Sequence, residues 1–394
     1  MRLWLAFLAV LLAQAQQGPT LDVSLLGRIR TKVAENLKRL PNYTCTQTII
    51  RSLRRMPAAK LQRLDMVRLE VAFVGGKELY GRPGSGRIDQ SQITKLVGGT
   101  IGNGDFGVLP SSIFLGDSAH FQYNGASKLD GKPAIRYDYA VPQVASGYQI
   151  QAGSAAAIVG YHGSFWVDPD TLDLIRLEVS ADDIPNRLKV ASAVDRMEYD
   201  RISIGSSQFL LPRGAEMDIT DSSGGESQNR VRLQACHEFV GESALSFQNL
   251  PAENFVAPVK PTLAQLTLPD DFSMELGLDT PIDSASSAVG DAFEAVLRQN
   301  VLAESGLVLP KGTRVSGHIA RLEKVGALYY VGLSLDVLSL EHGHAELSER
   351  ANEVTTKTLQ PLIFRLDRVK LARSTHLIVR SRLLKSEDHD PVRQ

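Results

Sequence analysis

The chain has little of what marks several large functional classes. Its 394 residues include only two cysteines, and 43 basic against 44 acidic residues give a net charge of −1. A nucleic-acid binder needs a basic excess to neutralise phosphates, so this balance argues against that partner. The chain also lacks a run of like charges that would attract an anionic membrane surface. Its length allows two or three domains.

Long apolar runs are missing beyond the first residues. After Met1 the chain has a basic residue, Arg2, then an apolar run over residues 3–13 that leads into the triplet Ala13-Gln14-Ala15. This order predicts a secretory signal peptide over residues 1–15, cleaved after Ala15. An uncleaved membrane anchor is the alternative, but a bilayer span needs ~20 apolar residues. We therefore expect a periplasmic or secreted protein with no transmembrane span in the mature chain.

Recognisable catalytic motifs are also missing. The chain contains neither the G-x-S-x-G of serine hydrolases nor the H-E-x-x-H of zinc proteases. The stretch "GNGDFG", residues 102–107, fits G-x-G-x-x-G, but Pro110 follows too closely for the long helix of a dinucleotide site. His342 and His344 lie two residues apart without an evident third ligand. The sequence therefore predicts a protein that is not an enzyme and holds neither a cofactor nor a metal.

The two cysteines both lie within strand-like segments, Cys45 in "LPNYTCTQTII" and Cys236 in "VRLQACHEFV". In an exported protein two cysteines are expected to pair, so we predict a Cys45–Cys236 disulfide; two buried free thiols are the alternative. Strand alternation groups Cys45 with Tyr43 and Gln47, on a mixed face. We therefore expect the bond on the outer side of a curved sheet, holding the two ends of that sheet together.

The first folded element is predicted to be a helix over residues 21–40. Leu25, Ile29, Val33 and Leu37 recur every four residues, and Pro41 ends the pattern. A second, short helix is predicted over residues 106–116.

Strand patterns dominate residues 42–245. The clearest is the hairpin "GSFWVDPDTLDLIRLEVS", which turns at residues 168–170. Its return strand is predicted to place Ile175, Leu177 and Val179 on one face. "KLDGKPAIRYDYAV" is a similar hairpin, with Tyr137 on the apolar face of its second strand.

A second β-rich region follows a proline-rich stretch. The pattern predicts a mainly β protein: a curved antiparallel half-barrel packed on the N-terminal helix, then a small C-terminal β-barrel or sandwich. The predicted boundaries are a signal peptide 1–15, a half-barrel domain 20–249, a linker 250–271, a β-barrel domain 272–385 and a disordered tail 386–394.

A curved sheet with one apolar face, covered by an amphipathic helix, can enclose a cavity for a lipid or acyl chain. The alternative is that side chains fill this space as an ordinary core. The residues alone favour the filled core.

The first region resembles the LolA/LolB-like superfamily of periplasmic lipid and lipoprotein carriers, which includes LppX-type carriers and RseB-type regulators. The resemblance rests on the helix-to-strand segment "LKRLPNYTCTQTI" and on the hairpin "GSFWVDPDTLDLIRLEV". It implies that the concave face holds a lipid beneath helices that form a lid. By that resemblance, Tyr137, Phe165, Ile175 and Leu177 are expected to line the cavity.

The whole chain also resembles secreted proteins of acidobacteria through "LPNYTC", "SFWVDPDT" and "LPKGT". The second region is similar to the β-barrel domain of outer-membrane scaffold proteins in type IV secretion, through "TPI", "VGDAFEAVL" and "LVLPKGTRVSGHI". That second likeness implies contact with other envelope proteins, although the membrane-crossing segment of the scaffold family is missing here.

The leading functional prediction is an exported, non-enzymatic envelope protein that binds a lipid or an acylated protein in the half-barrel. The alternative is an envelope scaffold or adaptor that contacts protein or peptidoglycan through the C-terminal barrel, with the half-barrel filled. A hydrolase is the third interpretation. A polar cleft with perturbed pKa values would point to it.

Overall fold

The computed structural model describes most of the chain between Pro19 and Arg380. The described residues are 19–54, 60–75, 77–85, 88–89, 100–102, 108–153, 155–239, 264–265, 273–302, 308–340, 343–346 and 361–380. The predicted signal peptide, the predicted tail and most of the predicted linker lie outside these residues. Within them, no helix is long and apolar enough to cross a membrane.

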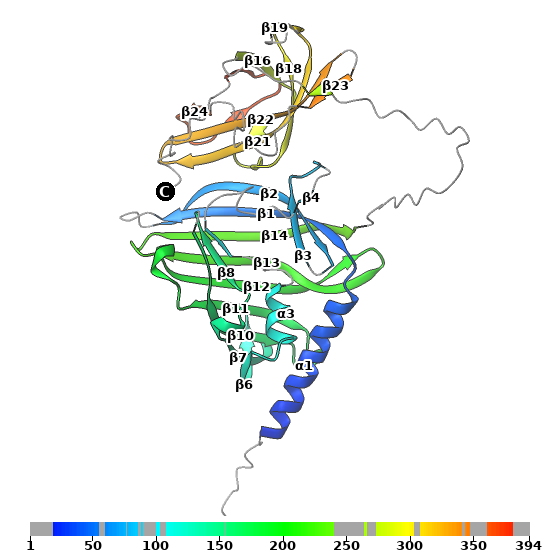
Figure 1. The fold of residues 1–394 in the computed structure, drawn as a ribbon, viewed down its shortest axis with the longest axis vertical. Coiled ribbons are helices and arrows are strands. Elements are labelled where there is room, and N and C mark those ends of the chain that lie inside the picture. The colour runs from blue at the N-terminus through cyan, green and yellow to red at the C-terminus, as the bar shows by residue number, and fades with distance from the viewer. Residues whose placement is uncertain are drawn as a thin grey trace, which may run out of the picture.

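The larger part of the molecule is an eleven-stranded, fully antiparallel curved sheet (Figure 1), which confirms the predicted half-barrel. Its strands in spatial order are β4 (Ile88–Asp89), β3 (Lys77–Gly81), β2 (Gln62–Val74), β1 (Tyr43–Arg54), β14 (Glu226–Glu238), β13 (Ser207–Asp221), β12 (Val190–Ile204), β11 (Leu174–Asp182), β10 (Gly160–Val167), β7 (Lys132–Val141) and β6 (His120–Leu129). Tight turns join the outer hairpins; Asp130 and Gly131, both with positive φ, form the β6–β7 turn.

Two helices cover one face of this sheet. Helix α1 (Pro19–Arg39) runs along it, and the short helix α3 (Val108–Phe114) lies beside α1 over the middle strands (Figure 1). The predicted apolar stripe of α1 is confirmed, because Ile29 and Val33 are buried and Leu25 and Leu37 pack against the same core. The small antiparallel strands β5 (Thr100–Gly102), β8 (Gln149–Ala152) and β9 (Ala155–Ile158) form a separate three-stranded sheet.

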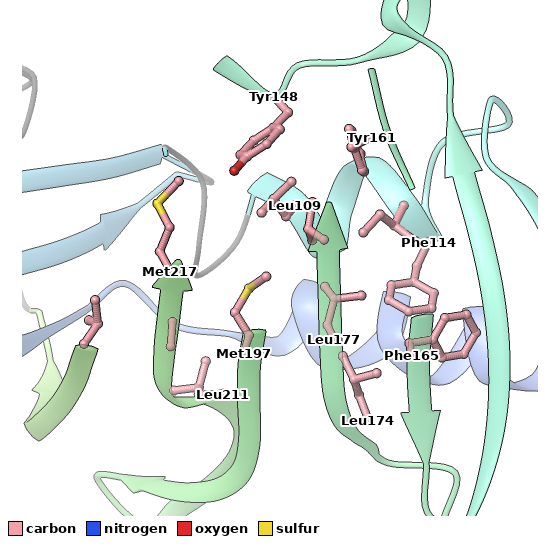
Figure 2. Close-up of a cluster of buried hydrophobic side chains, with 14 of the residues drawn as sticks. Leu109, Phe114, Tyr148, Tyr161, Phe165, Leu174, Leu177, Met197, Leu211 and Met217 are labelled. Atoms are coloured by element: carbon pink, nitrogen blue, oxygen red, sulfur yellow. The ribbon is translucent and has the colours of Figure 1, made fainter. Parts of the chain in front are cut away.

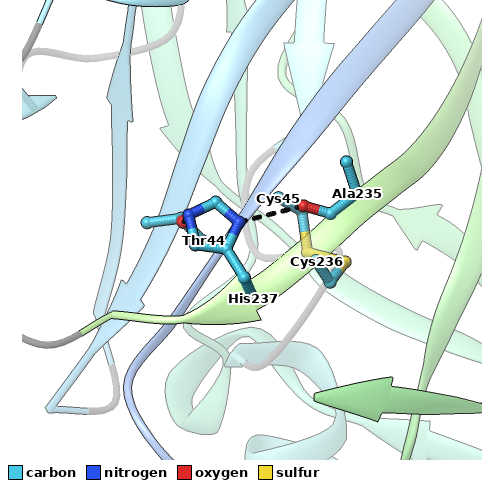
Figure 3. The surroundings of a disulfide bond; sticks show 5 residues. All are labelled: Thr44, Cys45, Ala235, Cys236 and His237. Atoms are coloured by element: carbon cyan, nitrogen blue, oxygen red, sulfur yellow. Dashed lines mark hydrogen bonds between the residues drawn. A yellow bond between two sulfur atoms is a disulfide. The ribbon is translucent and has the colours of Figure 1, made fainter. Parts of the chain in front are cut away.

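The structure contains the predicted disulfide, with the Cα atoms of Cys45 and Cys236 4.1 Å apart (Figure 3). Its predicted location was wrong in two respects. Cys45 is 1% exposed and belongs to the core that faces the helices, so the bond is not on the outer side. Strands β1 and β14, which it joins, are neighbours inside the sheet, whose ends are β4 and β6.

A β-bulge explains the first error. Between the pairs Thr44–His237 and Thr46–Gln234, Cys45 faces two residues, Ala235 and Cys236. Ala235 has φ 50°. The extra residue shifts the alternation of β14 by one position, so Cys236 turns to the buried side.

The C-terminal part is a nearly closed β-barrel with its own core, as predicted. Its main strands are β15 (Ala264–Gln265), β16 (Ser273–Leu278), β18 (Ala292–Leu297), β21 (Arg314–Val325), β22 (Leu328–Leu340), β23 (Gly343–Glu346), β24 (Leu362–Phe364) and β26 (His376–Arg380). The short pairs β17 (Ile282–Asp283) with β25 (Lys370–Leu371) and β19 (Val301–Leu302) with β20 (Val308–Leu309) extend it. Met274, Leu276 and Leu278 of β16 are buried in that core.

The barrel lies against the β2 side of the half-barrel (Figure 1). Strand β2 pairs with β3 only from Glu70 onward, so its earlier residues have a free edge. Val289 occupies that edge in a parallel bridge with Val67. Charged side chains add to the contact, because Arg68 forms an ion pair with Asp291.

Candidate functional site

The concave face of the half-barrel, beneath α3 and α1, is the candidate site (Figure 2). Inward positions of neighbouring strands supply an almost wholly apolar surface. Its larger buried side chains are Tyr137, Tyr139, Tyr161, Phe165, Leu174, Leu177, Val179, Met197, Leu211 and Met217. Unbranched methionine side chains adapt to different partners, so Met197 and Met217 give this floor plasticity.

Helix α3 fills the space above this surface. Leu109, Ile113 and Phe114 are each at most 1% exposed, and all belong to the same core. The spacing 109–113 is one helical turn, so one face of α3 points into the concavity. In the structure described here, this region of the half-barrel is a filled core, as the residues alone favoured.

Aromatic side chains pack closely at the centre. The Tyr137 and Phe165 rings are stacked with centroids 5.2 Å apart. Phe114 of α3 meets Phe165 edge-on at 5.0 Å, so the helix inserts an aromatic ring directly onto the sheet. Such pairs contribute ~0.5–1.5 kcal/mol beyond area burial.

The two helices are held in different ways. Asn36 of α1 forms two reciprocal hydrogen bonds with the backbone of Leu210, at 2.8 and 3.0 Å. Lys32 lies 3.0 Å from the Asp173 carboxylate at the β10–β11 turn. These contacts attach α1 to the sheet itself.

Helix α3 is attached mainly to its neighbour α1. Arg30 of α1 donates from Nε to Phe114 O at 2.8 Å and from Nη2 to Gly116 O at 2.9 Å, which satisfies carbonyls at the C-terminal end of α3. Ser112 Oγ lies 2.7 Å from the Tyr161 hydroxyl on the sheet. Two of these three hydrogen bonds therefore attach α3 to α1, and one attaches it to the sheet.

Three of the four residues expected to line a cavity come together here. Tyr137, Phe165 and Leu177 are fully buried in the main core. Ile175 is not among them: it packs on the opposite face of the sheet against Trp166, in a small separate cluster. The predicted face of the return strand was wrong at this position.

A bulge again explains the difference. Trp166 pairs with Arg176 and Val167 pairs with Leu174, so Ile175 is the extra residue of β11. The alternation restarts at Leu177, and Val179 follows it on the concave side as predicted.

Polar groups on the concave face were not found by the sequence reasoning. Asp195 is 0% exposed and lies between inward-facing Ala193 and Met197 of β12. Gln47 is 1% exposed on β1, and among the described residues its Oε1 has no hydrogen-bond partner. The spacing Ala193-x-Asp195-x-Met197 was the available signal, because it places an acid at an inward position.

The tyrosines of this face are in a low-dielectric environment. Burial, with smaller contributions from Tyr161, Tyr199, Tyr148 and Asp195, raises the pKa of Tyr139 well above its ordinary value. Burial also raises the pKa of Tyr161, against the lowering effect of the Ser112 hydrogen bond. Tyr139 and Tyr161 therefore stay neutral and act as hydrogen-bonding groups.

A hollow of about 510 Å³ lies where the barrel meets the half-barrel. Pro83 and Gly84 line it on one side, and Thr280, Ser286 and Asp291 on the other. The Asp291 carboxylate is already engaged by Arg68 and by the Ala288 amide. Within the described part of the chain, no three His, Cys, Asp or Glu side chains are grouped as metal ligands.

Solved structures match about half of the chain. A LolA superfamily protein from Nitrosomonas europaea matches 54% of this chain and 94% of its own length, with 10% identity and a TM-score of 0.25. The lipoprotein LppX of Mycobacterium tuberculosis matches 56% and 98%, with 12% identity and a TM-score of 0.21. A DUF1329 family protein from Desulfovibrio piger matches 58% and 97%, with 14% identity and a TM-score of 0.29.

No protein-family model and no curated protein matches the chain. A LolA superfamily protein is thus among the structures to which the chain is similar. The likeness of the second region to secretion scaffolds stays a prediction.

Proposed function

We propose that the protein is a non-enzymatic carrier or sensor of the bacterial envelope that binds an acyl chain on the concave face of the half-barrel. The observation that carries this proposal is the way in which helix α3 covers the concave face. A seven-residue helix with three buried apolar side chains, Leu109, Ile113 and Phe114, fills a concave apolar sheet and is held by few polar contacts. The filled core is then the ligand-free state, and an acyl chain replaces α3.

Magnitudes make this exchange feasible. Burial of one Leu, Ile or Phe side chain contributes ~1.5–3 kcal/mol, and burial of one methylene contributes ~0.8 kcal/mol. Removing the three α3 side chains from the core therefore costs free energy. Burial of roughly six to eleven methylenes of an acyl chain would offset that cost. Chains of about ten or more carbons are expected to bind, and much shorter chains are not.

The test uses the full chain after solvent delipidation. Isothermal titration calorimetry with 1-monoacylglycerols of increasing chain length is expected to show no heat of binding for short chains and clear binding from about ten carbons onward. Mass spectrometry of an organic extract from natively purified protein would identify the natural cargo. No binding at any chain length, together with a clean extract, contradicts the proposal.

A matched pair of variants locates the binding surface. Leu177 and Ile175 lie two residues apart on β11 but on opposite faces. Leu177→Asn places an amide against the chain and is expected to weaken binding about tenfold or more, because an unpaired buried polar group costs ~1–3 kcal/mol. Ile175→Asn is expected to leave affinity unchanged. If Leu177→Asn does not fold, the chain-length series of the unsubstituted protein still decides.

A second candidate function is an envelope scaffold or adaptor that works through the C-terminal barrel. It is favoured by large apolar side chains of the barrel that are more than half exposed, at Ile363, Leu366 and Ile378. Capture of a defined envelope protein or of peptidoglycan by the full chain, lost in an Ile363→Ser/Ile378→Ser variant, would support this role. Such a result combined with no acyl binding would replace the carrier proposal.

A further inference from the structure

Strand β6 forms one end of the curved sheet, and its outer edge is open to solvent. Only Leu129 of its ten residues is buried. Among the described residues, β7 is the one strand that pairs with β6, and no loop backbone bonds to it. Figure 1 shows this end of the sheet far from the C-terminal barrel, which lies against β2 at the other side. Unpaired backbone groups along an exposed strand form a template for another strand.

The register of the β6–β7 hairpin shows which backbone groups of β6 face outward. A two-residue turn makes the residues that flank it a hydrogen-bonded pair, so Lys132 and every second residue of β7 after it point toward β6. Asp138 is one of these residues, and it lies opposite Gln122. The N–H and C=O of Gln122 are therefore used within the hairpin, whereas those of Phe121 and Tyr123 point away from the sheet.

The same two residues carry the aromatic side chains of this edge. The Phe121 ring meets Phe165 edge-on at 6.1 Å, and the Tyr123 ring lies 5.1 Å from Tyr137, so both rings are on the concave side. Tyr123 is nevertheless 42% exposed. A further strand at this edge would cover the exposed ring and continue the aromatic row of the concave face.

We propose that β6 pairs with β6 of a second copy of this chain, in an antiparallel dimer whose twofold axis passes beside Gln122. In this register Phe121 of each copy lies opposite Tyr123 of the other, so the outward backbone groups form hydrogen-bonded pairs. The two aromatic side chains of each pair meet on one face, which is a favourable cross-strand combination. The concave faces of the two half-barrels then join along β6.

The edge is complementary to itself in shape and in charge. A register shift after Tyr123 leaves residues 120–123 as the regular part of the edge, and an axis beside Gln122 uses this part in both copies. Asp117 precedes the strand with a fully exposed side chain, and the exposed Lys128 lies near its other end. Antiparallel pairing brings Asp117 of one copy toward Lys128 of the other, twice in the dimer. Such complementary charges favour one partner and one register.

Cysteine trapping on the full chain tests this register. Facing residues of a pair without mutual hydrogen bonds have Cα atoms about 4.5 Å apart, which a disulfide can span. Gln122→Cys is therefore expected to give a covalent dimer under mild oxidation, visible on a non-reducing gel. Lys128→Cys is the matched control, because this exposed position is on the same strand but away from the axis and should stay monomeric.

A proline variant tests the outward backbone groups. Tyr123→Pro removes an N–H that makes no bond within the hairpin, so the fold should tolerate it. In the dimer this change removes two hydrogen bonds, one from each copy. The dimer dissociation constant from sedimentation equilibrium should therefore be at least about tenfold higher than in Tyr123→Val. The valine variant loses the same ring but keeps the N–H, and equal urea midpoints would show that both variants fold.

The unsubstituted chain is expected to dimerise weakly and with rising concentration, because one pair of strands covers a small area. Sedimentation as a monomer at every concentration, with no covalent Gln122→Cys dimer, overturns the proposal. Equal trapping of Gln122→Cys and Lys128→Cys does so too, as does a dimer of equal strength in Tyr123→Pro and Tyr123→Val. Trapping of Gln122→Cys on a different protein in native cells, without the dimer, would assign the edge to that partner instead. If Tyr123→Pro does not fold, the cysteine pair decides.

Discussion

Val289 of the C-terminal barrel and Val67 of the half-barrel lie side by side in a parallel β-bridge. The Arg68 amide donates to Val289 O at 2.8 Å, and the Val289 amide donates to Met66 O at 2.8 Å. The neighbouring Gly290 has φ 96°. Its Cα approaches the Arg68 carbonyl so closely that a side chain there would collide with the backbone. Backbone pairing, not side-chain packing alone, therefore fixes the barrel to the half-barrel.

Substitution of Gly290 tests this junction. Gly290→Ala adds a Cβ that collides with the Arg68 carbonyl, in a backbone conformation that alanine disfavours, at a cost of ~1–3 kcal/mol. Hydrogen exchange at the Arg68 and Val289 amides is expected to become faster. Gly312→Ala is the control, because φ is 89° but the space around its Cβ is open. Equal protection of both amides in the two variants would mean that the bridge does not depend on this close approach.

The disulfide is expected to contribute substantially to stability. Closing a loop between residues 191 apart limits the unfolded chain, and the entropy model gives about 5 kcal/mol as an upper figure. We expect the double variant Cys45→Ala/Cys236→Ala to unfold at a clearly lower urea midpoint than the oxidised protein. The dithiothreitol-reduced protein should match the variant. If oxidised protein and variant unfold together, the bond is thermodynamically neutral.

Strand patterns predicted this fold better than they predicted individual faces. The hairpin turns, the α1 stripe and the inward phase of Leu177 follow from local alternation, which the sheet preserves. Two predicted faces were wrong in the same way, because Ile175 and Cys236 each adjoin a register shift. A bulge inserts one residue into a strand, so every later side chain of that strand points to the opposite face. No local residue pattern predicts where a bulge occurs.

The site was predictable only in part for a related reason. That an apolar face exists could be seen from Tyr137 and Phe165. Helix α3 covers this face through long-range contacts, such as the hydrogen bond between Arg30 and Phe114, which are 84 residues apart. A local sequence pattern cannot reveal such contacts. Strand phase places Asp195 at an inward position, but a single acid between Ala193 and Met197 matches no motif that marks a binding site.

The barrel is expected to lose stability in acid through Asp283. Hydrogen bonds, first from Arg368 and then from the Ala285 amide, lower the pKa of Asp283 from 3.8 to about 2. A carboxyl group whose pKa is lowered by folding stabilises the folded protein at pH values above its pKa in the unfolded chain. This stabilisation is lost as the pH falls from about 4 to about 2. Because Arg368 is largely exposed, we expect ~1 kcal/mol or less.

Urea midpoints measured across that pH range test the Asp283 contribution. Asp283→Asn should be less stable than the unsubstituted protein at neutral pH and should converge with it near pH 2. Asp367→Asn, an exposed neighbour of Arg368, serves as control and should run parallel to the unsubstituted protein at every pH. Parallel curves for Asp283→Asn would instead assign its effect to local structure rather than to charge.

Arg30 is expected to control how readily α3 leaves the concave face. Its guanidinium holds the carbonyls of Phe114 and Gly116 from the neighbouring helix, whereas Asn36 and Lys32 attach α1 independently. Arg30→Ala therefore loosens α3 without releasing α1. Two lost hydrogen bonds of a charged donor correspond to several kcal/mol at most, because each contributes ~1.5–3 kcal/mol.

The expected result is faster hydrogen exchange over residues 108–116 and faster association of a twelve-carbon monoacylglycerol in stopped-flow measurements, with helix α1 still protected. Arg28→Ala is the matched control, because this arginine lies on the same helix and is exposed. Faster exchange without faster association would show that α3 opens but does not limit ligand entry. Unchanged exchange would show that the apolar side chains Leu109, Ile113 and Phe114 hold α3 on the sheet without help from Arg30.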